Sequence, residues 1–201
     1  ELLDAASQRG VTVINSPESV RLCCHRRELD VVLRRAGVSV PFTESDNGYW
    51  LKRADGTSEG PGDIRFAADS AERDRTMEDM RREGINDVIV SAHIPGDLLK
   101  FYGVRGSGFF RTFYPGDDGQ WKFCDEKHNG RPHHYAFSMD ALHAMAEKAA
   151  IASGTVIYGG DAIIGEDGQA IVIDFNDWPS FSRCRDEAAQ AIARVITSGL
   201  I

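Results

Sequence analysis

The chain lacks the features that mark membrane proteins and proteins that bind nucleic acids over a broad surface. No apolar run approaches the ~20 residues needed to span a bilayer, and the N-terminus carries no signal-like segment. Basic residues number 23 against 31 acidic residues, which gives a net charge of −8. Such a balance disfavours nucleic acid and membrane as partners, while a small anionic ligand could still be held by a few local cations.

Cysteine is scarce as well. The four cysteines are Cys23, Cys24, Cys124 and Cys184, and no two of them form a C-x-x-C pair. Cys23 and Cys24 are adjacent within a helical pattern, which suits reduced thiols better than a disulfide framework. We therefore expect a cytoplasmic protein. With 42% hydrophobic and 27% charged residues, the composition is that of a globular protein with one large domain or two small lobes.

Helical and strand patterns alternate irregularly along the chain, without an internal repeat. The chain begins at Glu1, inside what resembles the end of a helix, so we expect further residues before it in the complete protein. Helical patterns cover residues 16–37, 70–84, 138–154 and 183–198. Strand patterns cover residues 11–15, 48–56, 87–94, 98–106, 108–116, 156–164 and 170–176, and residues 38–42 are expected to be extended. This mixture predicts an α+β fold with mostly antiparallel pairing.

Acidic and amide side chains lie on two neighbouring strands near the end of the chain. Asp161 lies in "YGGDAII", and Asp174 and Asn176 lie in "AIVIDFN". The Asp-Gly turn between the strands predicts antiparallel pairing, and the two-residue spacing puts Asp174 and Asn176 on one face. Direct pairing from the turn places Asp161 opposite residue 173, so a bulge or a longer turn is needed to align it with Asp174. Asp177 points to the other face.

Hard oxygen ligands of this kind suit Mg²⁺, which takes one or two carboxylates and leaves its other positions to water and phosphate. We therefore predict a metal site formed by Asp161, Asp174 and Asn176, with Mn²⁺ as an alternative ion. The competing interpretation is a polar strand end that faces solvent. The otherwise apolar setting of these acids favours the metal site.

The segment "YGGDAII…IVIDFNDWPSF" resembles the C-terminal motif of the ATP-grasp superfamily, and its Asp-x-Asn, aromatic and proline order is similar to that of inositol polyphosphate kinases. The resemblance implies an α+β ATP-grasp fold, in which two lobes with mainly antiparallel sheets clasp ATP. It implies that residues 1–40 are the end of a preceding α/β domain and a linker helix, that 41–92 are the first lobe, and that 93–201 are the second lobe with the metal site. The first lobe is shorter than is usual in the superfamily.

The same resemblance implies where the nucleotide is held. Lys52, on a strand before the glycine-bearing loop, would meet the phosphates. Backbone groups of Ala92, His93 and Ile94 would read the adenine edge, and Asp97 would reach the ribose.

Further cations complete the implied phosphate site. Lys100 stands in "KFYGV", which is similar to a strand of the inositol phosphate kinases, and Arg111 would stabilise the charge on the transferring group. The upstream helix offers Arg26 and Arg27 where ligases of the superfamily usually have lysine.

The favoured function is that of a ligase that depends on Mg-ATP and activates a carboxylate as an acyl phosphate for attack by an amine or thiol. The alternatives are a kinase of a polyol or inositol phosphate, which would share every ATP contact, and a nucleotide-binding module without catalysis. In each enzyme reading the partner is a small, anionic substrate.

A zinc site is a weaker alternative use of "CDEKHNGRPHHY", which contains Cys124, His128, His133 and His134. Its spacing matches no closed zinc pattern. A surface loop at a substrate mouth is the preferred interpretation.

Overall fold

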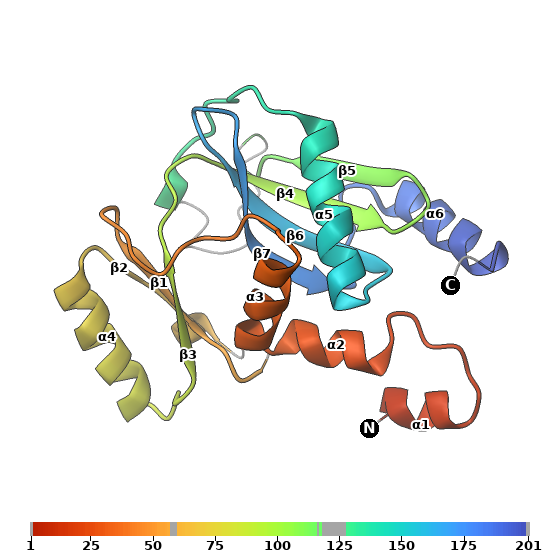
Figure 1. Cartoon of the computed structure of the whole chain (residues 1–201), viewed down its shortest axis with the longest axis horizontal. Helices are drawn as coiled ribbons and strands as arrows, with labels where there is room; N and C mark the ends of the chain where they lie inside the picture. The colour runs from red at the N-terminus through yellow and green to blue at the C-terminus, as the bar shows by residue number, and fades with distance from the viewer. Residues whose placement is uncertain (1, 57–59, 116, 118–127, 200–201) are drawn as a thin grey trace.

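The computed structural model describes residues 2–56, 60–115, 117 and 128–199. Figure 1 shows two separate sheets with helices packed around them. The elements are α1 (Leu2–Gln8), α2 (Pro17–Cys24), α3 (Arg26–Arg35), β1 (Tyr49–Arg53), η1 (Pro61–Asp63), β2 (Ile64–Ala67), α4 (Ser70–Arg82), β3 (Val88–Ala92), β4 (Asp97–Val104), β5 (Phe109–Phe113), α5 (Met139–Ser153), β6 (Ile157–Ile164), β7 (Ala170–Asp177) and α6 (Arg185–Thr197).

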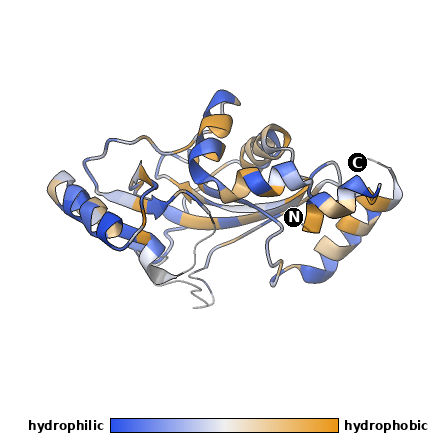
Figure 2. Ribbon diagram, turned by 90° about the horizontal axis from the view of Figure 1, so that it is seen from below, coloured by the Kyte–Doolittle hydropathy of each residue, from blue (hydrophilic) through white to orange (hydrophobic). Residues whose placement is uncertain are grey.

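The first sheet has the strand order β2-β1-β3 and is antiparallel throughout. Tyr49 and Leu51 of β1 are buried with Met80 of α4, so α4 covers one face of this sheet. Because side chains alternate along a strand, Trp50 and Lys52 point from the other face. Helix α4 itself is largely hydrophilic around its circumference (Figure 2), since it meets the sheet along only a narrow stripe.

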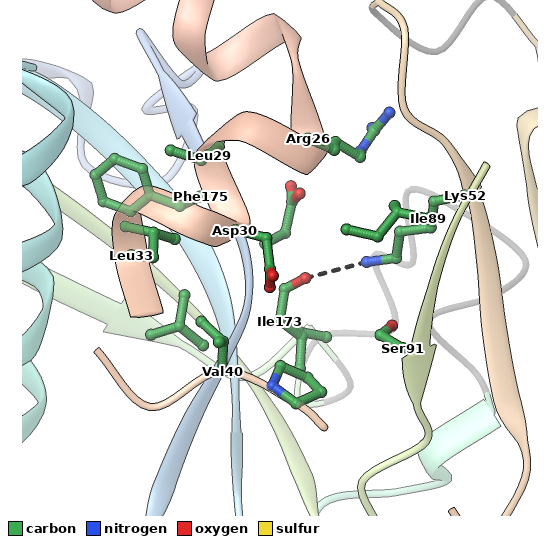
Figure 3. Close-up of a pocket in the computed structure, with 13 residues that line it drawn as sticks. Arg26, Leu29, Asp30, Leu33, Val40, Lys52, Ile89, Ser91, Ile173 and Phe175 are labelled. Carbon is green, nitrogen blue, oxygen red and sulfur yellow. Dashed lines mark hydrogen bonds between the residues drawn. The ribbon is translucent and has the colours of Figure 1, made fainter. Parts of the chain in front are cut away.

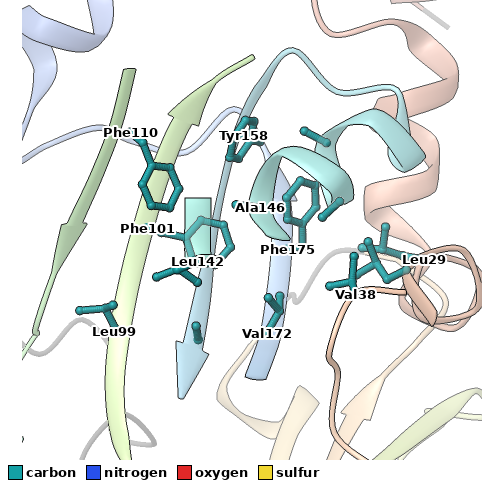
Figure 4. Packing of buried hydrophobic residues seen from close by; sticks show 14 of the residues in the cluster. Leu29, Val38, Leu99, Phe101, Phe110, Leu142, Ala146, Tyr158, Val172 and Phe175 are labelled. Atoms are coloured by element: carbon teal, nitrogen blue, oxygen red, sulfur yellow. The ribbon is translucent and has the colours of Figure 1, made fainter. Parts of the chain in front are cut away.

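The second sheet has the order β5-β4-β6-β7, again antiparallel. Its strands and α5 enclose the largest core cluster (Figure 4), in which Phe101, Tyr158 and Phe175 are at most 3% exposed. Helix α6 covers part of the opposite face through a second cluster around Tyr102 and Phe181. The predicted α+β architecture with antiparallel sheets is confirmed.

A β-bulge adjusts the pairing of β6 with β7. Asp161 lies opposite Asp174, whereas Ala162 lies opposite Val172, so Ile173 is the extra residue. The sequence required either a bulge or a longer turn to align Asp161 with Asp174, and the structure has the bulge. The bulge brings both carboxylates to the same position along the sheet.

The helix predicted over residues 16–37 is two helices, because the chain breaks at His25 with φ −108° and ψ 84°. His25 forms an isolated β-bridge with Asp55, and its Nδ1 lies 2.7 Å from the carbonyl oxygen of Arg21. This local competition for the backbone ends α2 and redirects α3 toward the sheets.

The strand predicted over residues 11–15 is wrong, because this segment is irregular. The Asn15 side chain instead bonds the start of β6, where Oδ1 accepts from the N–H groups of Val156 and Ile157 at 2.7 and 2.9 Å. Residues 38–42 are extended but form no strand of either sheet.

Among the described residues, no helix combines the length and the apolar character that a membrane crossing requires.

Candidate functional site: a charged face between two sheets

A row of charged side chains crosses the face of the second sheet that α5 leaves open. Lys100 on β4 lies opposite Asp161 on β6, and Asp161 lies opposite Asp174 on β7. Directly opposed residues of antiparallel strands share a face. The Lys100 ammonium is 3.1 and 3.2 Å from the two oxygens of Asp161, and the two side chains are 14% and 26% exposed. The pairing therefore gathers these predicted residues on one surface.

Asn176 occupies the next row on the same face, opposite Gly159. A Cβ atom on Gly159 would lie 2.8 Å from Pro179, so the glycine allows the segment after β7 to fold closely over the sheet. Trp178 and Phe181 in that segment have left-handed φ angles of 44° and 49°, and Trp178 is 53% exposed. The chain after β7 thus makes a tight, strained turn beside the predicted metal ligands.

Asp177 is separated from this row, as strand alternation predicts. It lies opposite Tyr158, whose side chain is buried on the α5 face. Burial raises the pKa of the Asp177 carboxyl. Burial and then the nearby Asp177 charge raise the pKa of Cys23 to about 12. Asp177 therefore belongs to the packing of α2 against β7.

Lys52 reaches from the first sheet to the second. Its Nζ donates to the carbonyl oxygen of Ile173 at 3.0 Å (Figure 3), which is the residue that the bulge inserts. Burial lowers the pKa of Lys52, against the opposing influence of the Asp174 and Asp161 carboxylates. The ammonium therefore lies beside the charged row, at the edge where the two sheets approach each other.

A pocket opens at this edge between α3, β1, β3 and β7 (Figure 3). Arg26 lines it and donates to the backbone oxygen of Arg53 at 2.8 Å, whereas the neighbouring Arg27 pairs with Asp87 at 2.6 Å. The structure thus separates the two upstream arginines and leaves Arg26 near Lys52. The pocket is lined by Arg26, Leu29, Asp30, Leu33, Val40, Pro41, Lys52, Ile89, Ser91, Val172, Ile173, Asp174 and Phe175.

The predicted hinge is held by the chain itself. The N–H groups of Ala92 and His93 donate to the carbonyl oxygens of Phe42 and Gly48 at 2.7 and 2.8 Å. The Ile94 carbonyl accepts from Asn129 at 3.1 Å. These two N–H groups and this carbonyl already have hydrogen-bond partners within the chain. Adenine contacts through the other backbone polar groups of the hinge stay a prediction.

The Asp97 carboxylate is fully buried, and strand alternation places it on the same face of β4 as Phe101. It accepts from the backbone N–H groups of His133 and Tyr135 at 2.7 and 3.0 Å and lies 3.1 Å from Nδ1 of His133. Burial alone would raise its pKa, but these hydrogen bonds outweigh burial and lower the pKa. This geometry favours a structural role for Asp97 over the predicted ribose contact.

Arg111 lies on the open face, opposite Tyr102, and pairs with Glu187 of α6. Arg183 was not among the cations that the sequence singled out. Its guanidinium lies 5.6 Å from the centre of the Phe113 ring and donates to the Tyr114 carbonyl at 3.3 Å. An arginine in a loop has no periodicity to mark it, so only its position shortly after β7 could have signalled it.

Within the part of the chain that the structure describes, no group of three or more His, Cys, Asp or Glu residues could hold a metal ion. The predicted site has two carboxylates and an amide, so it depends on water and phosphate for its other ligands. Of the zinc alternative, Cys124 lies outside the described residues. His128 packs on Phe66, and His133 and His134 pair with Asp97 and Asp117.

No protein-family model and no curated protein matches the sequence. Solved structures do. D-alanyl-alanine synthetase A from Vibrio cholerae shares 10% identity at a TM-score of 0.70, with 98% of this chain and 71% of that chain covered. A RimK domain ATP-grasp protein from Sphaerobacter thermophilus shares 20% identity at a TM-score of 0.66, with coverages of 96% and 74%.

The D-alanine-D-alanine ligase from Coxiella burnetii matches at 13% identity and a TM-score of 0.65, over 94% of this chain. The present chain spans only 59% of that ligase. Identities this low establish the fold alone. Together with the two antiparallel sheets, these matches show that the chain has the ATP-grasp fold.

Proposed function

We propose that the chain binds Mg-ATP between its two sheets and, as part of an ATP-dependent ligase, activates a carboxylate as an acyl phosphate. The observation that carries this proposal is the row of Lys100, Asp161 and Asp174, which Lys52 meets from the opposite sheet. The division into a first lobe at 41–92 and a second at 93–201 belongs to the same proposal.

The donor set fits a hard divalent cation. Asp161 and Asp174 supply carboxylate oxygens and Asn176 an amide oxygen, all on one face. When bound there, Mg²⁺ would neutralise charge on the phosphates. The cation already held by Asp161 is the Lys100 ammonium. With Mg²⁺ bound, the site would bring together the two kinds of positive charge that phosphoryl transfer uses.

The residues of this chain would act mainly by electrostatics. Lys52 and Lys100 would neutralise the phosphates, and Arg111 would steady charge on the transferring group. A carboxylate oxygen of the substrate attacks the γ-phosphorus and ADP leaves, after which an amine or thiol displaces phosphate. No side chain of the protein need become covalently attached.

Mg-ATP binding measured by calorimetry tests the site. Asp174→Asn and Asn176→Ala should each weaken affinity about 100-fold, which is the loss of roughly 2.7 kcal/mol of binding free energy. Asp177→Asn is the matched control, because this neighbouring acid points to the other face. Equal affinities in all three variants would refute the metal assignment.

Product analysis tests the reaction. Free phosphate together with an amide or thioester identifies a ligase, and a phosphorylated alcohol identifies the alternative kinase. Tight Mg-ATP binding without turnover on carboxylate or polyol acceptors would identify a non-catalytic nucleotide-binding module.

A further inference from the structure

A segment between β5 and α5 is tied to the link between the two sheets. We name residues 128–135 the strap. Asn129 donates from Nδ2 to the carbonyl oxygens of Ile94 and Gly96 at 3.1 and 3.2 Å. Farther along, the strap is held by the buried Asp97 carboxylate. The strap therefore crosses the link between β3 and β4.

The first residue of the strap lies against the first sheet. The His128 ring centre is 3.9 Å from that of Phe66, 5.3 Å from that of Trp50 and 6.0 Å from that of His93. Trp50 and Phe66 are directly opposite on β1 and β2. They share the face from which Lys52 reaches the second sheet, since Lys52 follows Trp50 by two residues. The strap thus lies against the hinge and against the face of the first sheet that carries Lys52.

His93 has to be neutral for this cluster to keep its hydrogen bond between the Trp50 and His93 side chains. Trp50 donates from Nε1 to Nδ1 of His93 at 3.1 Å. An indole N–H only donates, so this nitrogen of His93 must accept, which an imidazolium cannot do. Protonation of Nδ1 would place two N–H donors, one from Trp50 and one from His93, opposite each other and would break the hydrogen bond.

Among the residues that the structure describes, the side chains that face His93 offer an imidazolium no compensating negative charge. Trp50 faces His93 from β1, Phe66 from β2 and His128 from the strap, and none of the three carries a negative charge. Burial and then the proximity of His128 lower the pKa of His93.

We propose that the strap is a pH-sensitive latch, which His93 holds closed over the hinge end of the site when neutral and releases when protonated. The consequence for the nucleotide rests on the proposed function. The release itself does not.

The direction follows from proton linkage. Above pH ~6.5 an exposed histidine is neutral, so the closed and released states bind the same number of protons. Below that pH the released state takes up protons first, because the closed state holds the pKa of His93 down. Closure is therefore lost as the pH falls from about 6.5, by up to about tenfold per pH unit for each proton taken up.

Fluorescence of Trp50 and hydrogen exchange of the strap test the latch without nucleotide. The chain for fluorescence carries Trp121→Phe and Trp178→Phe, so that only Trp50 emits. Between pH 8 and 5 we expect its emission to change in one transition below pH ~6.5. Amide exchange in residues 128–135, corrected for its intrinsic pH dependence, should accelerate in the same window.

The deciding variant is His93→Asn with His128→Phe, which keeps an acceptor for Trp50 and a ring on Phe66 but cannot titrate. It should show no transition, whereas His134→Gln, at an exposed histidine of the strap outside the cluster, should behave like the parent. An unchanged transition in the double variant overturns the proposal. If that variant does not fold, histidine NMR titration of the parent decides, since protonation of His93 without faster strap exchange is equally contradictory.

The dissociation rate of Mg-ATP links the latch to the site. It should rise about threefold between pH 7 and pH 6 in the parent and stay constant in the double variant. Absence of Mg-ATP binding at pH 8 with an intact Trp50 transition would refute the proposed function and leave the latch standing. Tight binding without a Trp50 transition would refute the latch alone.

Discussion

The two faces of the second sheet are built from the same strands but differ in character, because one is apolar and buried and the other carries charged side chains. Toward α5, Phe101 and Tyr158 are fully buried in the largest core. On the other face, the adjacent positions Lys100 and Asp161 form a partly exposed ion pair. The α5 face carries the largest apolar core, whereas this part of the other face, beside the smaller core under α6, holds charges that folding alone does not require.

The bulge at Ile173 keeps these two faces in phase. Val172 on one side of the bulge and Phe175 on the other both pack into the α5 core, while Asp174 stays opposite Asp161. A shift of one residue without the bulge would exchange the faces of every later side chain. Packing of the apolar face thus fixes the register of β7 against β6, and this register places Asp174 opposite Asp161.

The largest expected effect tests the apolar face. Phe101→Ala should lower the free energy of unfolding by about 3–5 kcal/mol, because it opens a cavity in a fully buried core. Urea unfolding measures this loss. Lys100→Met, the preceding residue on the other face, should cost less than about 1.5 kcal/mol and should weaken Mg-ATP binding. Equal losses of stability would contradict the division between the faces.

The next effect tests the charge that faces the row from the first sheet. Lys52→Met should weaken Mg-ATP binding about 30-fold, or roughly 2 kcal/mol. The free energy of unfolding should not fall, because the variant removes a cation whose pKa burial already lowers. Calorimetry and urea unfolding of the same preparation separate the two results. A clear loss of stability would show that the bond to Ile173 is structural.

An intermediate effect tests the buried acid at the start of β4. Asp97→Asn should cost about 2 kcal/mol, since charge-assisted hydrogen bonds to His133 and Tyr135 are lost. The pKa of Asp97 is lowered from its ordinary value of 3.8 on folding, so its contribution is complete above about pH 4 and disappears as the pH falls through the lowered pKa. Acid unfolding curves should therefore be flatter for the variant. An identical acid slope would contradict this account.

The smallest effect is expected where the open face meets α6. Arg111 and Glu187 are 46% and 54% exposed, so Glu187→Gln should change the free energy of unfolding by less than about 1 kcal/mol. The same variant frees the Arg111 guanidinium. If Arg111 meets the transferring group, turnover should be kept in Glu187→Gln and lost in Arg111→Met.

Prediction from sequence succeeded where the pattern is local. Alternation along β6 and β7 predicted that Asp174 and Asn176 share a face and that Asp177 does not, and the pairing confirms both. The break at His25 was missed, because a helical pattern cannot show that a bridge to Asp55 competes for the backbone.

The sequence by itself determines which side chains of β4, β6 and β7 lie on the apolar face and which on the charged face, because a strand presents successive residues to opposite faces. The sequence does not determine which distant residues those side chains contact. Lys52 donates a hydrogen bond to Ile173, which is 121 residues away in the sequence. The Asp97 carboxylate accepts a hydrogen bond from the strap, and the His128 ring packs on Phe66. Such pairs depend on how two sheets and a crossing segment are placed in space, and that placement is decided by the packing of the whole chain.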